Sequence, residues 1–326
     1  MYTETFKKIT GHKKQIWQDF LNKASLEADE NVNQTVLIFD DDVLIATGSR
    51  QDNILKCIAV DPSRQGEDLT SKVLTLLRQS AFEEGFSHLF LYTKPENKYI
   101  FSSLFFYEIA KTDKVLLMEN RENGISAFIN SLDTENSEKT AGACVMNCNP
   151  FTLGHRYLIE TASKQCDQLY VFVVSEDKSE FSFKDRLEMV KRGCKDLKNV
   201  KVLETGPYLI SSATFPTYFL KDRDNAGEIQ CMLDIEIFSE YYAPHFSITK
   251  RFVGTEPLSP STEKYNLALK NHLPQKGIEL IEIPRLETNG VPISASKVRK
   301  LIKENELEVL KEYLPKTTLE YIKEDL

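Results

Sequence analysis

The chain has 326 residues, of which 41% are hydrophobic and 28% charged, and its formal net charge is −8. This length favours two domains, and this composition allows each domain to bury a core. The excess of 49 acidic over 41 basic residues disfavours a nucleic-acid partner, because phosphate backbones select basic surfaces.

The N-terminus contains no apolar signal-peptide core, and no apolar run reaches the length of a membrane span. Six scattered cysteines form no Cys-x-x-Cys pair, which argues against structural zinc and against a disulfide framework. We therefore expect a cytoplasmic protein that has no membrane association and no metal-ligating residues of its own.

Residues 1–118 have the pattern of three strands, a helix, a strand, a second helix and a last strand. The polar turn Asp40-Asp41-Asp42 is typical of a hairpin, and Gly85 ends the longer helix. The hydrophobic pattern predicts strands over 35–40, 43–49, 54–60, 88–93 and 115–119 and a helix over 69–84.

The composition becomes polar over residues 119–140, apart from one short apolar patch, and we interpret this stretch as a linker. It separates a first domain, residues 1–118, from a second domain, residues 141–326, that ends in helices.

Strands and helices alternate in the second domain. Nearly continuous apolar runs predict strands over 141–147, 169–174, 200–205, 248–254 and 278–283, with helices over 155–165, 183–194 and 263–272. Buried strands separated by helices indicate a Rossmann-like, doubly wound parallel sheet, which binds its ligand at the carboxyl ends of the strands.

The segment "TLGH", residues 152–155, lies between the first predicted strand of this sheet and the helix that follows it. A helix beginning presents unpaired N–H groups and a partial positive charge, which suit phosphate. Gly154 has no side chain to keep a phosphate away, and His155 can donate from a ring nitrogen. An ordinary strand-to-helix turn is the alternative for this segment alone.

The segment "ISASKVR", residues 293–299, forms a second helix beginning after another strand. Ser294 is a candidate N-cap, and Ser296 and Arg299 lie three residues apart on one helical face. The planar guanidinium of Arg299 can hold phosphate oxygens, although a solvated basic helix face is the alternative.

Together the two segments resemble the paired signature of the nucleotidyltransferase superfamily, a T/H-x-G-H loop and an I-S-x-S/T-x-x-R segment. The resemblance implies that Thr152 and His155 contact the ATP phosphates and that Arg299 acts with them in catalysis. It also implies nucleotide-binding residues at both segments and at the fourth-strand turn "VGTEP", which would form the adenine and ribose pocket. These residues are Asn147, Asn149, Phe151, Gly154, Gly254, Thr255, Glu256, Ile293, Ser294 and Ser296.

Longer words such as "SEFSFKDRLEMVK" and "GIELIEIPRLE" make residues 141–305 look like the citrate lyase ligase family, whose members also carry an N-terminal acetyltransferase-like (GNAT) domain. The resemblance implies an AMP-forming acid–thiol ligase. ATP, with Mg²⁺, and acetate would give acetyl-adenylate, and the acetyl group would pass to the CoA-derived thiol arm of the lyase's acyl carrier subunit. AMP and pyrophosphate would be released, and citrate lyase would be activated.

The first domain departs from a working acetyl-CoA transferase. In acetyltransferases of this fold a Q/R-x-x-G-x-G/A loop binds the pyrophosphate of coenzyme A, and here Ser63 and Asp68 replace two signature residues around Gly66. We expect the domain to receive the carrier's arm, and a purely stabilising domain is the alternative.

Three other readings remain open. They are an adenylyltransferase acting on a phosphorylated metabolite, an acetate–tRNA ligase, and an acetyl-CoA-dependent N-acetyltransferase using the first domain. Lys184 and Arg186 could face phosphate or acetate, or lie on the surface. Residues 210–219 could line an acetate slot, or Phe215 and Tyr218 could belong to a core.

Overall fold

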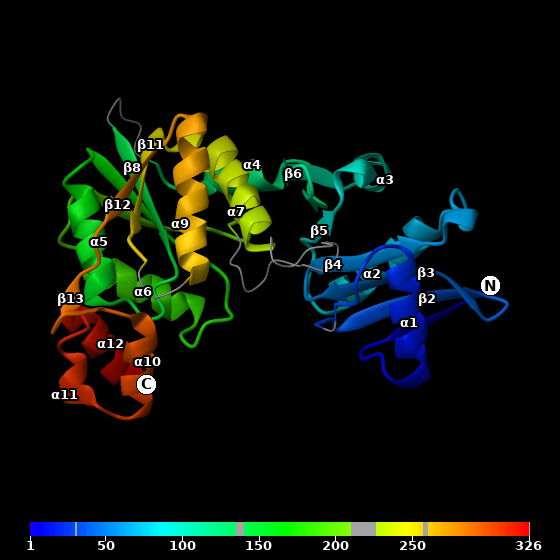
Figure 1. Cartoon of the computed structure of the whole chain (residues 1–326), viewed down its shortest axis with the longest axis horizontal. Coiled ribbons are helices and arrows are strands. Elements are labelled where there is room, and N and C mark those ends of the chain that lie inside the picture. The colour runs from blue at the N-terminus through cyan, green and yellow to red at the C-terminus, as the bar shows by residue number, and fades with distance from the viewer. Residues whose placement is uncertain (30, 135–139, 210–225, 257–259, 326) are drawn as a thin grey trace. The chain divides into compact units, whose positions relative to one another are not determined.

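The computed structural model describes all residues except 30, 135–139, 210–225, 257–259 and 326 (Figure 1). The described residues form two compact units. Met1–Gly124 with the described part of Thr214–Leu233 is the first unit, and the described parts of Ile125–Ala213 and Asp234–Leu326 are the second unit. The domain boundaries expected at residues 118 and 141 stay a prediction. Among the described residues, no helix is both long enough and apolar enough to cross a membrane.

The first unit is built on a seven-stranded sheet with the order β1-β2-β3-β4-β5-β7-β6 among the described residues. Neighbouring strands are antiparallel, except that β4 and β5 run parallel. The strands are β1 Tyr2–Phe6, β2 Gln34–Asp40, β3 Val43–Gln51, β4 Ile54–Val60, β5 Phe90–Thr93, β6 Tyr107–Lys111 and β7 Leu116–Glu119, and the helices are α1 Gly11–Lys23, η1 Pro62–Arg64, α2 Leu69–Glu83, η2 Pro95–Asn97 and α3 Lys98–Ser102.

The local chemistry of the first unit explains what the sequence pattern predicted. Asp41 and Asp42 have φ angles of 43° and 65°, the left-handed conformation that a two-residue hairpin turn requires. Helix α2 buries Leu69, Val73 and Leu77 in one core with β2, β3 and β4. The pattern did not show β1 and α1, because no residue of β1 is buried.

Strands β4 and β5 pair at two positions, Ile54 with Phe90 and Leu55 with Leu91. Beyond Leu55, strand β4 continues to Val60 without a further ladder position to β5 among the described residues. The outer edges of the two strands pair with β3 and β7. The sheet therefore opens between β4 and β5.

The second unit contains a five-stranded parallel sheet with the order β10-β9-β8-β11-β12 among the described residues. The chain moves outward in one direction from β8 and then returns to the other side of β8 with β11. This is the doubly wound topology, and its switch point lies between β8 and β11. The predicted fold class is confirmed. The strands are β8 Ala141–Met146, β9 Gln168–Val173, β10 Val200–Glu204, β11 Ile248–Gly254 and β12 Glu279–Ile283.

Both faces of this sheet are buried, which explains the nearly continuous apolar runs. Along β9, Val171 belongs to a core shared with the helices after β8 and β9 and with the C-terminal helices, whereas Phe172 packs against Tyr242 and Phe246. The helices after β7 are α4 Gly124–Ser131, α5 Leu153–Ser163, α6 Phe183–Cys194, α7 Ala226–Ile237, η4 Phe238–Tyr242, α8 Ala243–His245, α9 Pro260–His272, η5 Leu273–Lys276, α10 Ala295–Lys303, α11 Leu307–Leu310 and α12 Lys316–Asp325.

A short ribbon sets the beginning of α10. Strands β13 (Glu287–Thr288) and β14 (Val291–Pro292) pair around Asn289-Gly290, whose φ angles are 55° and 74°. Asn-Gly is the sequence that this tight turn favours. The Ile293 N–H then donates to the Leu286 carbonyl at 3.0 Å, so the chain turns directly from the ribbon into α10.

Candidate active site

A cavity of about 690 Å³ lies at the carboxyl edge of the parallel sheet. Its walls come from the ends of β8, β11 and β12, from the beginnings of α5 and α10, and from α9. This is the edge at which the topology predicts a ligand.

The beginning of α5 is closed by a capping box in which histidine takes the place of the usual acidic residue. The His155 N–H donates to Thr152 Oγ1 at 3.4 Å, and the Thr152 N–H donates to His155 Nδ1 at 3.1 Å. Because Nδ1 accepts this bond, the proton of the neutral ring lies on Nε2. The cap thus leaves Nε2–H as the ring's donor.

His155 is held in its neutral form. Burial of the ring lowers its pKa to about 4, and the nearby cation of Arg285 acts in the same direction. Phe151 stacks on the imidazole with a centroid separation of 6.1 Å and is itself fully buried. The ring is therefore a fixed, uncharged hydrogen-bond donor near neutral pH.

The beginning of α10 lies against the beginning of α5. A β-carbon built on Gly154 would lie 3.5 Å from Ile293 Cβ, which is ordinary van der Waals contact. Arg299 donates to the Asn149 carbonyl at 2.6 Å and to Ser296 Oγ at 3.1 Å. The two predicted phosphate-facing segments therefore meet, although well over a hundred residues separate them in the chain.

The partners of Arg299 include a carboxylate. Glu180 lies 3.7 Å from Arg299 Nε and 3.2 Å from Lys303 Nζ. Glu180 and Arg299 border a smaller cavity of about 370 Å³, whose lining also contains Asn147 and Asn149. An anion entering this space would compete with Glu180 for the cations.

The turn after β11 is fastened to the turn after β12. Arg285 donates from Nε to the Thr255 carbonyl at 2.7 Å and also forms an ion pair with the nearly buried carboxylate of Glu256. Asn266 donates to the Gly254 carbonyl at 2.9 Å. These bonds fix the far wall of the larger cavity.

The structure gathers most of the predicted site residues at this edge. The larger cavity is lined by Asn147, Thr152, Gly154, His155, Gly254, Glu256, Ile293, Ser294 and Ser296, and the smaller one by Asn147, Asn149 and Arg299. Phe151 and Thr255 line neither cavity. Phe151 supports the ring of His155 from the core, and Thr255 accepts bonds from Arg285.

Two arginines near the site were missed or left undecided by the sequence. Arg285 follows the carboxyl end of β12, and the rule that ligands bind at strand ends could have identified it. Lys184 is exposed, whereas Arg186 is fully buried and bonded to the loops that border the cavities. The proposed acetate slot, residues 210–219, lies outside the described part of the chain.

Comparisons with known proteins agree on one family. A family model described as the citrate lyase ligase C-terminal domain matches residues 141–322. A [citrate [pro-3S]-lyase] ligase of Klebsiella pneumoniae is 41% identical over 309 residues, covering 93% of this chain and 90% of the relative. The protein of the same name from Escherichia coli (strain K12) is 39% identical over 310 residues, covering 93% and 88%.

Similar solved structures cover parts of the chain. Escherichia coli ElaA covers 37% of this chain and 99% of its own, with 9% identity and a TM-score of 0.33. Thermotoga maritima TmcAL, bound with alpha-thio ATP, covers 56% of this chain and 55% of its own, with 17% identity and a TM-score of 0.34. The family model over the second unit and the relatives along nearly the whole length establish that this chain is an enzyme and belongs to the citrate lyase ligase family.

Proposed function

We propose that this enzyme uses ATP and acetate to acetylate the prosthetic-group thiol on the acyl carrier subunit of citrate lyase, and so activates the lyase. The observation that carries the proposal is the single cavity bordered by the beginnings of both α5 and α10. The partial positive charge at each helix beginning suits one polyphosphate. The shared name of the relatives, [citrate [pro-3S]-lyase] ligase, supports citrate lyase as the target.

The reaction proceeds in two steps. An acetate oxygen attacks the α-phosphorus of ATP, the bond to the leaving pyrophosphate breaks, and acetyl-adenylate forms. The thiolate of the carrier's arm then attacks the acetyl carbon, and AMP leaves with the electrons of the broken C–O bond. Negative charge gathers on phosphate oxygens in the first step, so positioned donors and cations lower its barrier.

In this proposal, His155 donates a hydrogen bond to an oxygen of the α-phosphoryl group. Its ring is neutral and carries its proton on Nε2, because Nδ1 accepts the Thr152 N–H. A neutral donor strengthens its bond as charge develops on a phosphoryl oxygen, without the larger desolvation cost of an imidazolium. Thr152 acts through this bond by holding the ring.

The leaving pyrophosphate is bound by Arg299, Ser294 and Ser296 in this proposal. The Ser294 hydroxyl makes no side-chain cap bond to its own helix, so it can donate to a phosphate oxygen. Arg299 is partly exposed at 27%, and its guanidinium reaches Ser296. Pyrophosphate would displace Glu180 from Arg299, because phosphate carries more charge than one carboxylate.

We propose that Gly254 and Glu256 form the adenosine part of the site and that Asn147 and Asn149 lie toward the phosphates, which is supported by their positions in the linings of the two cavities. Among the described residues, no group of three His, Cys, Asp or Glu side chains could hold a metal ion. We propose that Mg²⁺ accompanies ATP on its phosphate oxygens, where it would offset their charge. We also propose a cytoplasmic location, since ATP is a substrate and all six cysteines are free thiols.

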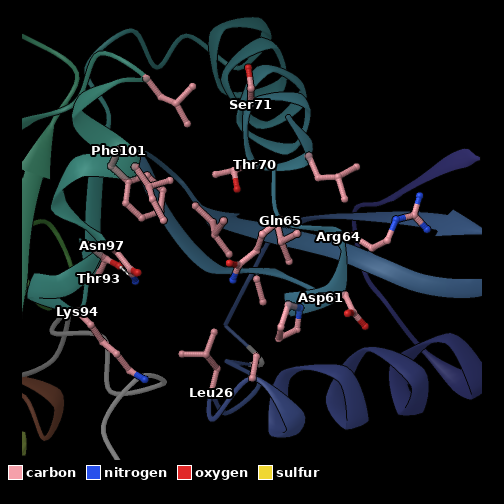
Figure 2. Close-up of a pocket in the computed structure, with 18 of the residues that line it drawn as sticks. Leu26, Asp61, Arg64, Gln65, Thr70, Ser71, Thr93, Lys94, Asn97 and Phe101 are labelled. Carbon is pink, nitrogen blue, oxygen red and sulfur yellow. Dashed lines mark hydrogen bonds between the residues drawn. The ribbon is translucent and has the colours of Figure 1, made fainter. Parts of the chain in front are cut away.

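The cavity of the first unit is proposed to hold the carrier's arm. It measures about 720 Å³ and occupies the opening between β4 and β5, where Figure 2 shows Thr70, Thr93 and Phe101 around it. The β4 edge beyond Leu55 pairs with no strand across this opening among the described residues, so its backbone groups are available to an amide-containing chain.

The charges around this cavity favour the neutral part of the arm. The cavity has no excess of basic side chains, since Asp61, Asp68 and Glu96 line it together with Lys23, Arg64 and Lys94. Arg64 is already bonded to Asp40 at 2.8 Å and to Glu67 at 2.6 Å. Carboxylates repel a pyrophosphate at close range. The cavity therefore suits the uncharged, amide-bearing segment of a CoA-derived arm better than the pyrophosphate of free coenzyme A.

Acetate-dependent exchange of labelled pyrophosphate into ATP tests the first step. We expect exchange in the wild type only when acetate is present, and a loss of about 100-fold or more in His155→Ala, because a donor to the developing charge is removed. His12→Ala is the matched control, since His12 is exposed on α1. Exchange that ignores acetate, or that survives His155→Ala, would refute the proposal.

Acetylation of the carrier thiol tests the second step in the full-length enzyme. Val60 lines the cavity of the first unit at the end of β4, and Val60→Trp would fill part of it. We expect the KM for the carrier to rise about tenfold, because the indole would exclude part of the arm from the cavity. This corresponds to a loss of about 1.4 kcal/mol of binding free energy. Acetate-dependent pyrophosphate exchange should be unchanged. An unchanged KM for the carrier would exclude an arm-binding role for this cavity.

A further inference from the structure

Arg186 is buried beneath the edge of the parallel sheet that carries the candidate site. It lies in the first turn of α6, and its side chain is 0% exposed. Nη1 donates to the Asn147 carbonyl at 2.9 Å, to Asn147 Oδ1 at 2.7 Å and to the Val174 carbonyl at 2.8 Å. Nε donates to the Phe181 carbonyl at 3.2 Å, and Nη2 donates to the Glu176 carbonyl. One side chain thus joins the ends of β8 and β9 to the beginning of α6.

The charge of Arg186 is costly where it lies. Its acceptors are four backbone carbonyls and one amide oxygen, and no ion pair of Arg186 is formed within the described residues. Burial lowers the pKa of the guanidinium. The carboxylates of Asp177 and Glu176 act on this charge from a distance and offset only part of that effect. A buried cation without a carboxylate in direct contact is rare, and neutral residues could fill the same space at lower cost. Stability therefore gives little reason for arginine at this position.

The hydrogen bonds of Arg186 determine the orientation of the Asn147 side-chain amide. A guanidinium has donors and no acceptor, so the oxygen of the Asn147 amide faces Arg186 and its nitrogen faces away. Nδ2 lies 3.1 Å from Ser179 Oγ. Asn147 is exposed and lines both cavities. Because one N–H of Nδ2 donates to Ser179, the amide has one further N–H to offer at the border between the two cavities.

We propose that Arg186 is a positioning residue of the nucleotide site, which holds Asn147 with its amide nitrogen toward the phosphates of ATP. The inference rests on the proposed function, since it requires a triphosphate at this edge. Its buried positive charge adds attraction for the same anion, because charges in a dry environment are weakly screened. Arg186 itself does not touch the nucleotide.

A double-mutant cycle separates this role from a purely structural one. The variants are Arg186→Lys, Asn147→Ala and their combination, and the probe is a non-hydrolysable ATP analogue titrated into the full-length enzyme. We expect each single change to raise the Kd about tenfold, and the second change to add less than about twofold, because residues that act as a unit are not additive. Arg192→Lys is the matched control, since Arg192 lies on the same helix and is exposed at 41%.

The kinetics give an independent readout. In the exchange assay, Arg186→Lys should raise the KM for ATP about tenfold and lower kcat less than about threefold, since positioning of a ground-state contact affects binding first. If Arg186→Lys does not fold, Asn147→Asp replaces it as the test variant. Its carboxylate keeps the bond to Arg186 but has no donor for phosphate, so the protein should fold and bind the analogue at least tenfold more weakly, on the order expected for a lost donor and an added negative charge.

Each outcome decides the matter. Additive effects of the two single changes, or analogue binding by Asn147→Asp equal to that of the wild type, would overturn the role of Arg186 and leave the proposed function standing. A wild-type enzyme that binds no ATP analogue would overturn the proposed function and, with it, the role of Arg186.

Discussion

The two units each contain a cavity of similar size, about 720 Å³ in the first and about 690 Å³ in the second, and each cavity is bordered by a helix beginning. The first is lined by three acidic and three basic side chains, whereas the charged side chains that line the second are Arg251, Arg285 and Glu256. The loop before α2 brings Asp61 and Asp68 to the first cavity, whereas the second has His155, Arg285 and the N–H groups of two helices. A helix beginning alone does not specify an anion site, because the charges of the nearby side chains determine whether an anion binds there.

The two cavities also arise in different ways. The first is a gap in a mostly antiparallel sheet, produced because β4 and β5 pair at two positions and then separate. The second is the switch point of a doubly wound sheet, where loops from β8 and β11 run in opposite directions. A gap between strands offers backbone hydrogen bonds to an extended chain, and a switch point offers helix beginnings to phosphate.

The largest effect is expected when the cation of the smaller cavity beside the second one is removed. Arg299→Ala should lower kcat/KM for pyrophosphate exchange about 1,000-fold, because a cation on a transferring phosphate is lost. Lys300→Ala, an exposed neighbour on the same helix, should change it less than about twofold, as is usual for surface charges. An Arg299→Ala enzyme with near-normal exchange would remove the distinction between the two cavities.

A second test asks whether Gly154 serves the ligand or the protein. A β-carbon at Gly154 would meet Ile293 at 3.5 Å, so the fold has room for it. Gly154→Ala should keep its thermal stability and raise the KM for ATP about tenfold, because the added methyl group would keep the phosphate away.

Gly193→Ala supplies the opposite control. A β-carbon there would lie 2.3 Å from the buried ring of Phe151. We expect this change to lower the free energy of unfolding by about 1–3 kcal/mol, as overpacking does. If Gly154→Ala lost stability to the same extent, its glycine would be explained by packing and not by phosphate.

The pH dependence of stability gives a third test, which concerns the neutral ring of His155. Its pKa falls from 6.5 to about 4 on folding, so between these values the unfolded chain binds more protons and stability declines as pH falls. Urea unfolding of the wild type between about pH 6.5 and pH 5 should show a loss of about 1.5 kcal/mol beyond that of His155→Gln. Equal losses in both proteins would show that His155 is not held neutral by the fold.

The smallest expected effect concerns the first cavity. Glu67→Gln removes one of the carboxylates that occupy Arg64, so coenzyme A should bind about threefold more tightly while pantetheine binding stays the same, as expected for a partly exposed charge. Calorimetric titration of both compounds measures this. Wild-type enzyme that binds coenzyme A far more tightly than pantetheine would show that the first cavity accepts a pyrophosphate after all.

Much of the fold could be predicted because its signals are local. The helix over 183–194 agrees with α6 to the residue, and the strands of the second unit were expected within one or two residues, since continuous apolar runs mark buried strands. Strand β1 and helix α1 were missed, because β1 is not buried and α1 buries little more than Trp17 and Leu21.

The candidate site could be predicted where its residues belong to a short, contiguous sequence motif. The two segments at 152–155 and 293–299 are short and contiguous, so their chemistry can be read without the fold. Arg186 and Arg285 were not assigned, because their importance depends on contacts across the sheet edge with Asn147 and Glu256. Such contacts follow from strand register, which a single sequence does not fix.

The central claim is that the beginnings of α5 and α10 bind one triphosphate. A crystal structure of the enzyme with a non-hydrolysable ATP analogue tests it most directly. We predict phosphate oxygens within hydrogen-bond distance of both His155 Nε2 and the Arg299 guanidinium, with Glu180 displaced from Arg299. An analogue bound in the cavity of the first unit, or in contact with one helix beginning and not the other, would contradict the account.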